Sequence, residues 1–196
     1  NSDILNDIKK NGHEIGIHPN FMENSSHGKS IEEIIEFCLR IVPDAKLIRT
    51  HCLHQSTKLL TKVFKLFPQL EIDLSTFTYH FPKVCFFDQI FDDVKIKRIN
   101  FNWEDDFEFW NKNFDWDSSN LFAKINILNF HPIHIFLNSK SHDKYNALMN
   151  DIDRKPLHLS DKKVLNKFKN SGVGANNYLT SIISSDHKQI KLREIK

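Results

Sequence analysis

The chain has 196 residues, of which 27 are Lys or Arg and 25 are Asp or Glu, so its formal net charge is +2. Because nucleic-acid-binding proteins usually carry a clustered basic surface, this balance argues against a nucleic-acid partner. Hydrophobic residues make up 40% of the sequence, and Gly and Pro are few. This composition excludes a disordered chain and predicts a single packed domain over residues 1–196.

The sequence contains no long apolar run and no secretory leader, so it predicts no membrane-spanning segment. Its cysteines, Cys38, Cys52 and Cys85, are widely spaced and form no Cys-x-x-Cys pair. Neither a zinc knuckle nor a disulfide framework is therefore indicated. This cysteine usage suits a reducing compartment, and we expect a cytoplasmic location.

The first predicted element is a helix that has Ile4, Leu5 and Ile8 on one face and stops at Gly12. An α/β barrel ordinarily opens with a strand, and Asn1 is not an initiator methionine. We therefore expect the chain to be a fragment whose first strand lies upstream of Asn1.

Strands and helices alternate along the rest of the chain, which favours an α/β barrel or a doubly wound sheet. The apolar runs predict strands over 13–17, 47–49, 70–74, 94–101, 123–130 and 189–195. Helical spacing, which starts at a capping box of Ser30 and Glu33, predicts helices over 31–39, 59–67, 107–110, 145–152, 161–168 and 176–183. The Phe-rich residues 76–92 are expected to be irregular, either as a covering loop or as a short helix under the barrel.

Four of the apolar runs share one layout, because each leads into His, Arg, Asp or Glu. These runs lead to His18, to Arg49 and His51, to the acids at 104–106, and to His131. In a barrel of parallel strands, the active site is built where the strands end at their carboxyl termini. The layout therefore predicts that these side chains face a pocket.

Each candidate has a functional and a structural interpretation. His18 is interpreted as a metal ligand or catalytic group, against a buried, hydrogen-bonded histidine. Arg49 can orient a carboxylate through paired hydrogen bonds, or it can be a structural ion-pair partner. His51 can bind a metal or move protons. Of His131 and His134, which flank Pro132 and Ile133, we select His131.

The acidic run of Glu104, Asp105 and Asp106 follows Trp103 directly. Its carboxylates could supply a general base, a metal ligand or a partner for Arg49. They could equally be the acidic first turn of a helix, which the helix dipole favours. The side chains of three tryptophans could stack on sugar rings or pack in the core: Trp103, Trp110 and Trp116.

These motifs resemble a known family. Gly12-His13-Glu14-Ile15-Gly16-Ile17-His18 is similar to the second motif of NodB-homology polysaccharide deacetylases, which belong to the carbohydrate esterase family 4 superfamily. Residues 13–21, 49–51, 103–106 and 130–138 look more closely like a branch associated with bacterial surface-polysaccharide gene sets. The resemblance covers roughly residues 10–140.

The resemblance implies a distorted (β/α) barrel of six or seven parallel strands. It also implies a hydrolase that uses a divalent metal, expected to be zinc, to remove an N- or O-acetyl group from a carbohydrate. Family members hold the metal with one aspartate and two histidines, and they use a second aspartate as base and a late histidine as acid. A bound metal ion lowers the pKa of its water and polarises the acyl group.

By position, His18 matches the first histidine ligand of the family, and Arg49 matches the arginine that orients the base. Asp105 or Asp106 falls in the fourth motif, and His131 matches the general acid. The resemblance thus implies that His18 binds the metal, with His51 as a substitute ligand. It implies catalytic roles for Arg49, Asp105, Asp106 and His131.

The chain departs from the family pattern at three places. Met22 occupies the position of the second ligand histidine, and Arg49-Thr50-His51-Cys52 replaces Arg-x-Pro-Tyr. The first motif would fall before Asn1. Three explanations remain open. His51 or an acid of 104–106 replaces the missing metal ligand, an upstream segment supplies the missing ligands, or this branch of the family has lost the metal.

Two other functions remain open at this point. A catalytically silent barrel that binds glycan or scaffolds an assembly pathway is favoured by Met22. A different metal-dependent hydrolase, acting on an amide or a phosphoester, is the third hypothesis. The sequence leaves the sugar and the oligomeric state open.

Overall fold

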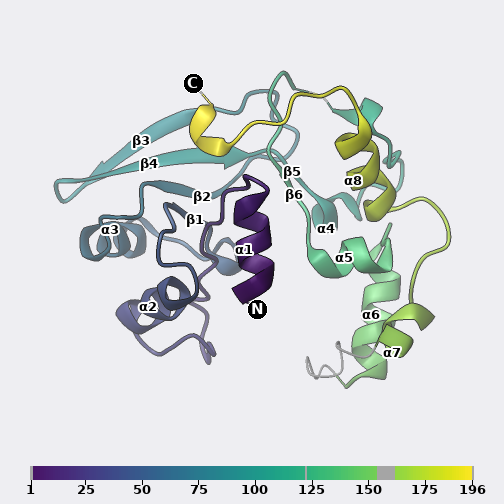
Figure 1. Ribbon diagram of the computed structural model, residues 1–196, viewed down its shortest axis with the longest axis horizontal. Helices are drawn as coiled ribbons and strands as arrows, with labels where there is room; N and C mark the ends of the chain where they lie inside the picture. Colours follow the sequence, from purple (N-terminus) through teal and green to yellow (C-terminus); the bar gives the residue numbers. More distant parts are fainter. Residues whose placement is uncertain (1, 122, 154–161, 196) are drawn as a thin grey trace. The chain divides into compact units, whose positions relative to one another are not determined.

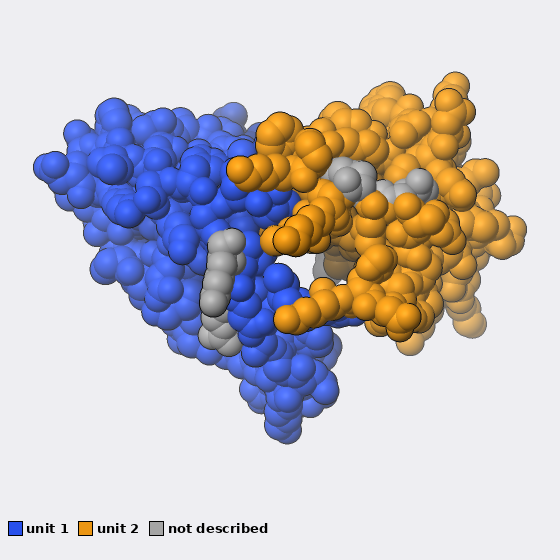
Figure 2. Space-filling view, turned by 90° about the horizontal axis from the view of Figure 1, so that it is seen from above, with its two compact units in different colours: residues 1–78, 84–101, 189–196 blue, residues 79–83, 102–188 orange. Residues whose placement is uncertain are grey.

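The computed structural model describes residues 2–121, 123–153 and 162–195. It divides into two compact units (Figure 2). Unit 1 comprises residues 1–78, 84–101 and 189–196, and unit 2 comprises residues 79–83 and 102–188. The prediction of a single domain over 1–196 stays a prediction, and each unit is described by itself.

Unit 1 is built on a four-stranded sheet with the order β1-β2-β4-β3 (Figure 1). Its strands are β1 (Leu47–Ile48), β2 (Ile72–Phe77), β3 (Phe86–Phe91) and β4 (Val94–Phe101). Its helical segments are α1 (Ser2–Lys10), α2 (Ile31–Ile41), η1 (His51–Leu53), α3 (Thr57–Leu66) and η4 (Leu192–Glu194). β1, β2 and β4 are parallel, as predicted, and β3 is antiparallel to β4.

Helices α2 and α3 cover one face of this sheet (Figure 1). The capping box forms as predicted, because the Ser30 hydroxyl accepts from the backbone N–H of Glu33 and the Glu33 carboxylate accepts in return. Ile35, Val63 and Ile96 are completely buried between the helices and the strands. Each such side chain contributes about 1.5–3 kcal/mol relative to an exposed one, so aliphatic burial holds unit 1 together.

The structure corrects the prediction for residues 76–92. β2 extends to Phe77, and β3 forms a hairpin with β4. Asp92 and Asp93 both have positive φ, 48° and 59°, which is the backbone that a tight hairpin turn requires. The Phe-rich strand escaped the sequence analysis because Asp-Asp is a weak turn signal compared with Asn-Gly.

Unit 2 has a two-stranded parallel sheet of β5 (Trp103–Glu104) and β6 (Leu128–Asn129). Its helical segments are α4 (Asp105–Glu108), η2 (Ser118–Asn120), α5 (Pro132–Leu137), α6 (His142–Asp151), α7 (Lys162–Lys167) and α8 (Ala175–Ser184). The predicted helix over 161–168 therefore forms from Lys162, and position 161 lies outside the described residues. Its core contains an aromatic cluster around Trp103 and Tyr178 and a separate aliphatic cluster of Leu137, Leu148, Ile152 and Leu165.

Two predicted strands in the second half of the chain are shorter than expected or absent. The strand over 123–130 is reduced to β6, because the Asn126 side chain donates to the Ala123 carbonyl and closes a turn. The strand over 189–195 does not form. The Leu192 N–H instead donates to the Glu14 carboxylate, and residues 192–194 form a 3-10 turn.

The mixed α/β class is confirmed, whereas the described residues contain no closed barrel. The predicted strand over 13–17 pairs with β1 only through an isolated parallel bridge between Ile17 and Ile48. None of the described helices combines the length and the apolar character that crossing a membrane would need.

Candidate active site

A short parallel ladder places the first candidate group, in unit 1. The Ile17 N–H donates to the Leu47 carbonyl, and the Arg49 N–H donates to the Ile17 carbonyl. The His51 N–H then donates to the Pro19 carbonyl at 2.9 Å. Because the two segments run side by side beyond β1, the ladder brings His18 next to Arg49 and His51, as the sequence analysis predicted.

The His18 ring is fixed by two polar contacts. Its Nδ1 lies 2.8 Å from the carbonyl oxygen of Arg49, and a carbonyl can only accept, so Nδ1 carries the proton. Nε2 is therefore the basic nitrogen, and it lies 3.2 Å from Nδ1 of His51. The two rings meet edge to face with centroids 5.3 Å apart. His18 thus presents a metal-competent nitrogen toward a second imidazole.

Arg49 projects from the same segment, and its guanidinium carbon lies 4.8 Å from the centroid of the Phe101 ring. Such a cation–π contact holds the side chain in place while leaving guanidinium edges for hydrogen bonds. The segment after His51 is strained, because Cys52 and Leu53 both have positive φ, 51° and 52°.

A buried polar cluster, which sequence reasoning missed, supports this segment. The Thr50 N–H donates to Ser75 Oγ at 2.9 Å, and the Ser75 hydroxyl donates to Asp73 Oδ1 at 2.6 Å. Arg98 Nε donates to the other oxygen of Asp73 at 2.8 Å. Burial raises the pKa of the Asp73 carboxyl, and the hydrogen bonds from Ser75 and the charge of Arg98 oppose this effect.

The signal for this cluster was partly visible in the sequence. Asp73 and Ser75 are two residues apart on β2, so they share one face of the strand. Arg98 is the register partner of Asp73 on β4, however, and that pairing is fixed only by the sheet.

The second candidate group lies in unit 2, at the ends of β5 and β6. The parallel register pairs Glu104 with Asn129, and the Asn129 amide donates to the Glu104 carboxylate at 2.5 Å. The chain then enters α4 with Asp105 and α5 with Pro132, whose N-cap is His131. The register therefore places Asp105 beside His131.

Asp105 is fully buried and holds His131 through two hydrogen bonds. The His131 N–H donates to Oδ2 at 2.8 Å, and the ring Nδ1–H donates to Oδ1 at 2.6 Å. The pKa of His131 is raised, chiefly by the hydrogen bond to Asp105, with smaller contributions from the charges of Asp105, Asp106 and Glu104, and burial opposes the shift. His131 therefore retains its proton to a higher pH than an ordinary imidazole.

His134 lies beside His131, with ring centroids 5.7 Å apart. It is buried, and burial lowers its pKa. The ligand atoms of Asp106, His131 and His134 all lie within 4.8 Å of one another, so this trio could hold a cation. Both histidines thus reach one place, although the sequence analysis selected only His131.

The predicted residues therefore form two groups, one in each unit. Unit 1 brings together His18, Arg49 and His51, and unit 2 brings together Asp105, Asp106 and His131. The catalytic and metal-binding roles assigned to them stay predictions.

Glu108, near the second group, is a further acid that the sequence analysis missed. It is fully buried, and it accepts hydrogen bonds from the Tyr79 hydroxyl at 3.0 Å and from Asn111 at 2.8 Å. Burial, followed by the charge of Glu108, raises the pKa of Tyr79 to about 12.

The tryptophans divide between core and surface. Trp103 is completely buried and Trp116 is 7% exposed, and both belong to the aromatic cluster of unit 2. Trp110 is 76% exposed. Of the three, Trp110 alone has an open indole face for stacking on a sugar.

Comparisons with known proteins indicate the family of the chain. A family model described as WbmS-like polysaccharide deacetylase matches residues 1–149. A crystal structure from Bordetella bronchiseptica is also similar, with 25% sequence identity and a TM-score of 0.72, over 92% of this chain and 74% of that chain. That protein is assigned as a polysaccharide deacetylase involved in O-antigen biosynthesis. No curated protein sequence matches the chain.

Proposed function

The chain belongs to the WbmS-like polysaccharide deacetylase family, and from this premise we propose that it is a metal-dependent hydrolase that removes an acetyl group from a carbohydrate of a bacterial surface polysaccharide. The observation that carries the proposal is the His131–Asp105 pair, a charge-supported imidazole at a strand end. A cytoplasmic location, favoured by the free cysteines, is part of the proposal. So is the barrel of six or seven strands, supported by the parallel pairing of β1, β2 and β4 and of β5 with β6.

The donors of unit 1 fit a divalent ion such as zinc. A metal-binding histidine usually donates its other ring N–H to a carbonyl or carboxylate, and His18 does this with the Arg49 carbonyl. We propose that His18 Nε2 and His51 Nδ1, which lie 3.2 Å apart, supply two ligands to the ion. When bound, the ion would supply an activated water and a polarised acyl carbonyl.

The remaining catalytic roles are assigned to side chains of the protein. His131, with its Nδ1–H held by Asp105, gives the proton on Nε2 to the sugar nitrogen or oxygen as its bond to the acetyl carbon breaks. Asp105 and Asp106 supply the negative charge that keeps this proton on His131 before the transfer. For Arg49 we propose the role that the resemblance implies, the orientation of a carboxylate base through paired hydrogen bonds.

We prefer His131 as an acid rather than as a metal ligand for an electrostatic reason. The neighbouring carboxylates favour its protonated form, in which Nε2 carries a proton to donate and has no lone pair for a metal ion. His18 is exposed, and because its Nδ1 faces the Arg49 carbonyl, Nε2 is the ring nitrogen that can bind a metal ion.

Acetate release from acetylated oligosaccharides tests the proposal directly. The metal-loaded wild type is expected to release acetate, His131→Ala to lose the activity, and His187→Ala, an exposed histidine of the same unit, to retain it. A wild type that binds the oligosaccharide without releasing acetate would favour the glycan-binding alternative, for which Met22 is the supporting observation. Hydrolysis of an unrelated amide or phosphoester alone would favour the third hypothesis.

A further inference from the structure

Unit 2 contains a cavity of about 990 Å³ that the proposed chemistry does not use. It is lined by side chains from 109–116 and 140–146 and by Val173. Pockets that bind small molecules typically measure about 300–1,000 Å³ and combine an aromatic lining with a few polar groups. The cavity is therefore large enough for an extended ligand.

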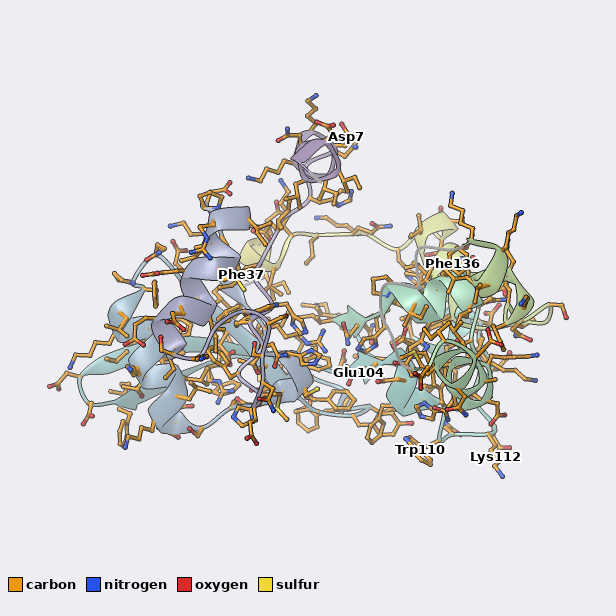
Figure 3. All side chains as sticks on the ribbon, turned by 90° about the horizontal axis from the view of Figure 1, so that it is seen from below. Asp7, Phe37, Glu104, Trp110, Lys112 and Phe136 are labelled. Atoms are coloured by element: carbon orange, nitrogen blue, oxygen red, sulfur yellow. The ribbon has the colours of Figure 1, made fainter. Side chains whose placement is uncertain are left out.

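The wall of the cavity offers one aromatic face to a ligand. Trp110 follows α4, and its side chain is labelled in Figure 3. It is 76% exposed, and its ring centroid lies 5.2 Å from that of His142. Phe114 and Trp116 line the same cavity but pack edge to face against each other. A single exposed aromatic residue is normal on a protein surface. The Trp110 indole differs because it forms part of a cavity wall, with an apolar face and one N–H donor, which suits a sugar ring.

Charge at the rim favours a neutral ligand. Lys112 and Lys140 contribute two positive charges, and Asp115 and Asp143 contribute two negative ones, all from exposed side chains. A polyanion would meet as much repulsion as attraction at this rim. A neutral sugar, which has both hydroxyl donors and acceptors, can use both kinds of group.

The ring of Phe109 lies between the cavity and His134, which is next to the proposed general acid, His131. Phe109, which lines the cavity, packs edge to face on His142 at 5.0 Å between centroids and on His134 at 4.8 Å. His134 in turn contacts the ring of His131. A ligand in the cavity would therefore lie within unit 2, beyond Phe109 from the His131–Asp105 pair.

We propose that this cavity is a subsite for the non-reacting residues of a neutral N-acetylhexosamine chain, with Trp110 as its stacking platform. The choice of sugar rests on the proposed function, whereas the cavity, its exposed indole and its balanced charge do not. The subsite explains how the enzyme could select a chain over a single sugar.

Binding without turnover tests the subsite. In the full chain carrying His131→Ala, we would titrate an N-acetylhexosamine tetrasaccharide and the corresponding monosaccharide by calorimetry. Adding Trp110→Ala is expected to weaken tetrasaccharide binding by roughly tenfold or more, and Trp110→Phe by less. Phe81→Ala removes another exposed aromatic side chain of unit 2, outside the cavity lining, and is expected to change nothing. Far-UV circular dichroism checks the fold of each variant.

The outcomes separate this inference from the proposed function. Equal affinity with and without the Trp110 substitution, or no tetrasaccharide binding at all, overturns the subsite. Competition by inorganic phosphate would overturn its neutral character. Binding that depends on Trp110, in a wild type that releases no acetate, retains the subsite and rejects the deacetylase. In an active enzyme, Trp110→Ala should raise KM for the tetrasaccharide and leave kcat unchanged.

Discussion

The two units place their candidate groups by different means. In unit 1, backbone hydrogen bonds between 17–19 and 47–51 position His18 and His51, above a core of aliphatic side chains. In unit 2 the strands have two residues each, and a buried carboxylate, Asp105, fixes His131. The first arrangement depends on the register of the sheet. The second depends on one side chain, and it should therefore be far more sensitive to a single substitution.

The largest expected effect on activity comes from substitution of Asp105. Asp105→Asn removes the charge behind His131, and we expect kcat/KM to fall by about 10²–10⁴-fold, the range for general acid catalysis. The raised pKa of His131 implies that wild-type activity falls as pH rises through it, and the variant should lose activity at a lower pH. A pH profile of acetate release measures both. Asp151→Asn, an exposed acid of unit 2, should leave the profile unchanged, and equal profiles for the two variants would contradict the role of Asp105.

Metal content tests which unit holds the ion. We expect wild type to bind the ion stoichiometrically, His18→Ala to lose it, and His134→Ala to retain it, by elemental analysis of the purified full chain. Loss on His134→Ala with retention on His18→Ala would instead place the ion at Asp106, His131 and His134 in unit 2. It would also make His131 a ligand, which conflicts with its role as acid.

The sheet of unit 1 offers a matched comparison of two ion pairs. Asp73 is fully buried against Arg98, whereas Asp88 meets Lys95 at the surface, and both cations are on β4. Asp73→Ala leaves Arg98 without its charge partner, and we expect a loss of about 3–5 kcal/mol in the free energy of unfolding. Asp88→Ala should cost under about 1 kcal/mol. Urea unfolding measures both, and similar losses would contradict the larger cost expected for breaking the buried pair.

A smaller effect concerns the reactivity of cysteines in unit 1. Burial raises the pKa of the Cys38 thiol to about 11, whereas Cys52 is exposed. Because the thiolate is the reactive form, alkylation at pH 8 should modify Cys52 first and Cys38 last. Peptide mass spectrometry gives the order. Early modification of Cys38 would mean that the core of unit 1 opens readily.

Sequence patterns located the candidate residues better than they located the elements between them. His18 and His51 were expected together because parallel strand ends meet at one edge, and the ladder from Ile17 to His51 confirms that proximity. Asp105 and His131 meet for the same reason, through β5 and β6. Their catalytic roles are still predictions.

Other features of the structure depend on contacts between residues far apart in the sequence, which no local pattern contains. Asp73 needs the register of β4 to find Arg98, and Glu108 needs Tyr79, 29 positions away, to become a satisfied buried acid. Residues 86–91 formed a strand because β4 was available as a partner. Tertiary pairing decided these features, so they could not be derived from propensity alone.

The distribution of aromatic residues confines the intrinsic Trp and Tyr fluorescence of the protein to unit 2. The chain has three Trp and three Tyr, and all six belong to unit 2: Tyr79, Trp103, Trp110, Trp116, Tyr145 and Tyr178. Intrinsic fluorescence therefore reports on unit 2 alone, while the sheet of unit 1 contributes to far-UV circular dichroism. Coincident denaturation curves from the two probes would mean that both units unfold as one cooperative body. Separate curves would assign a stability to each unit.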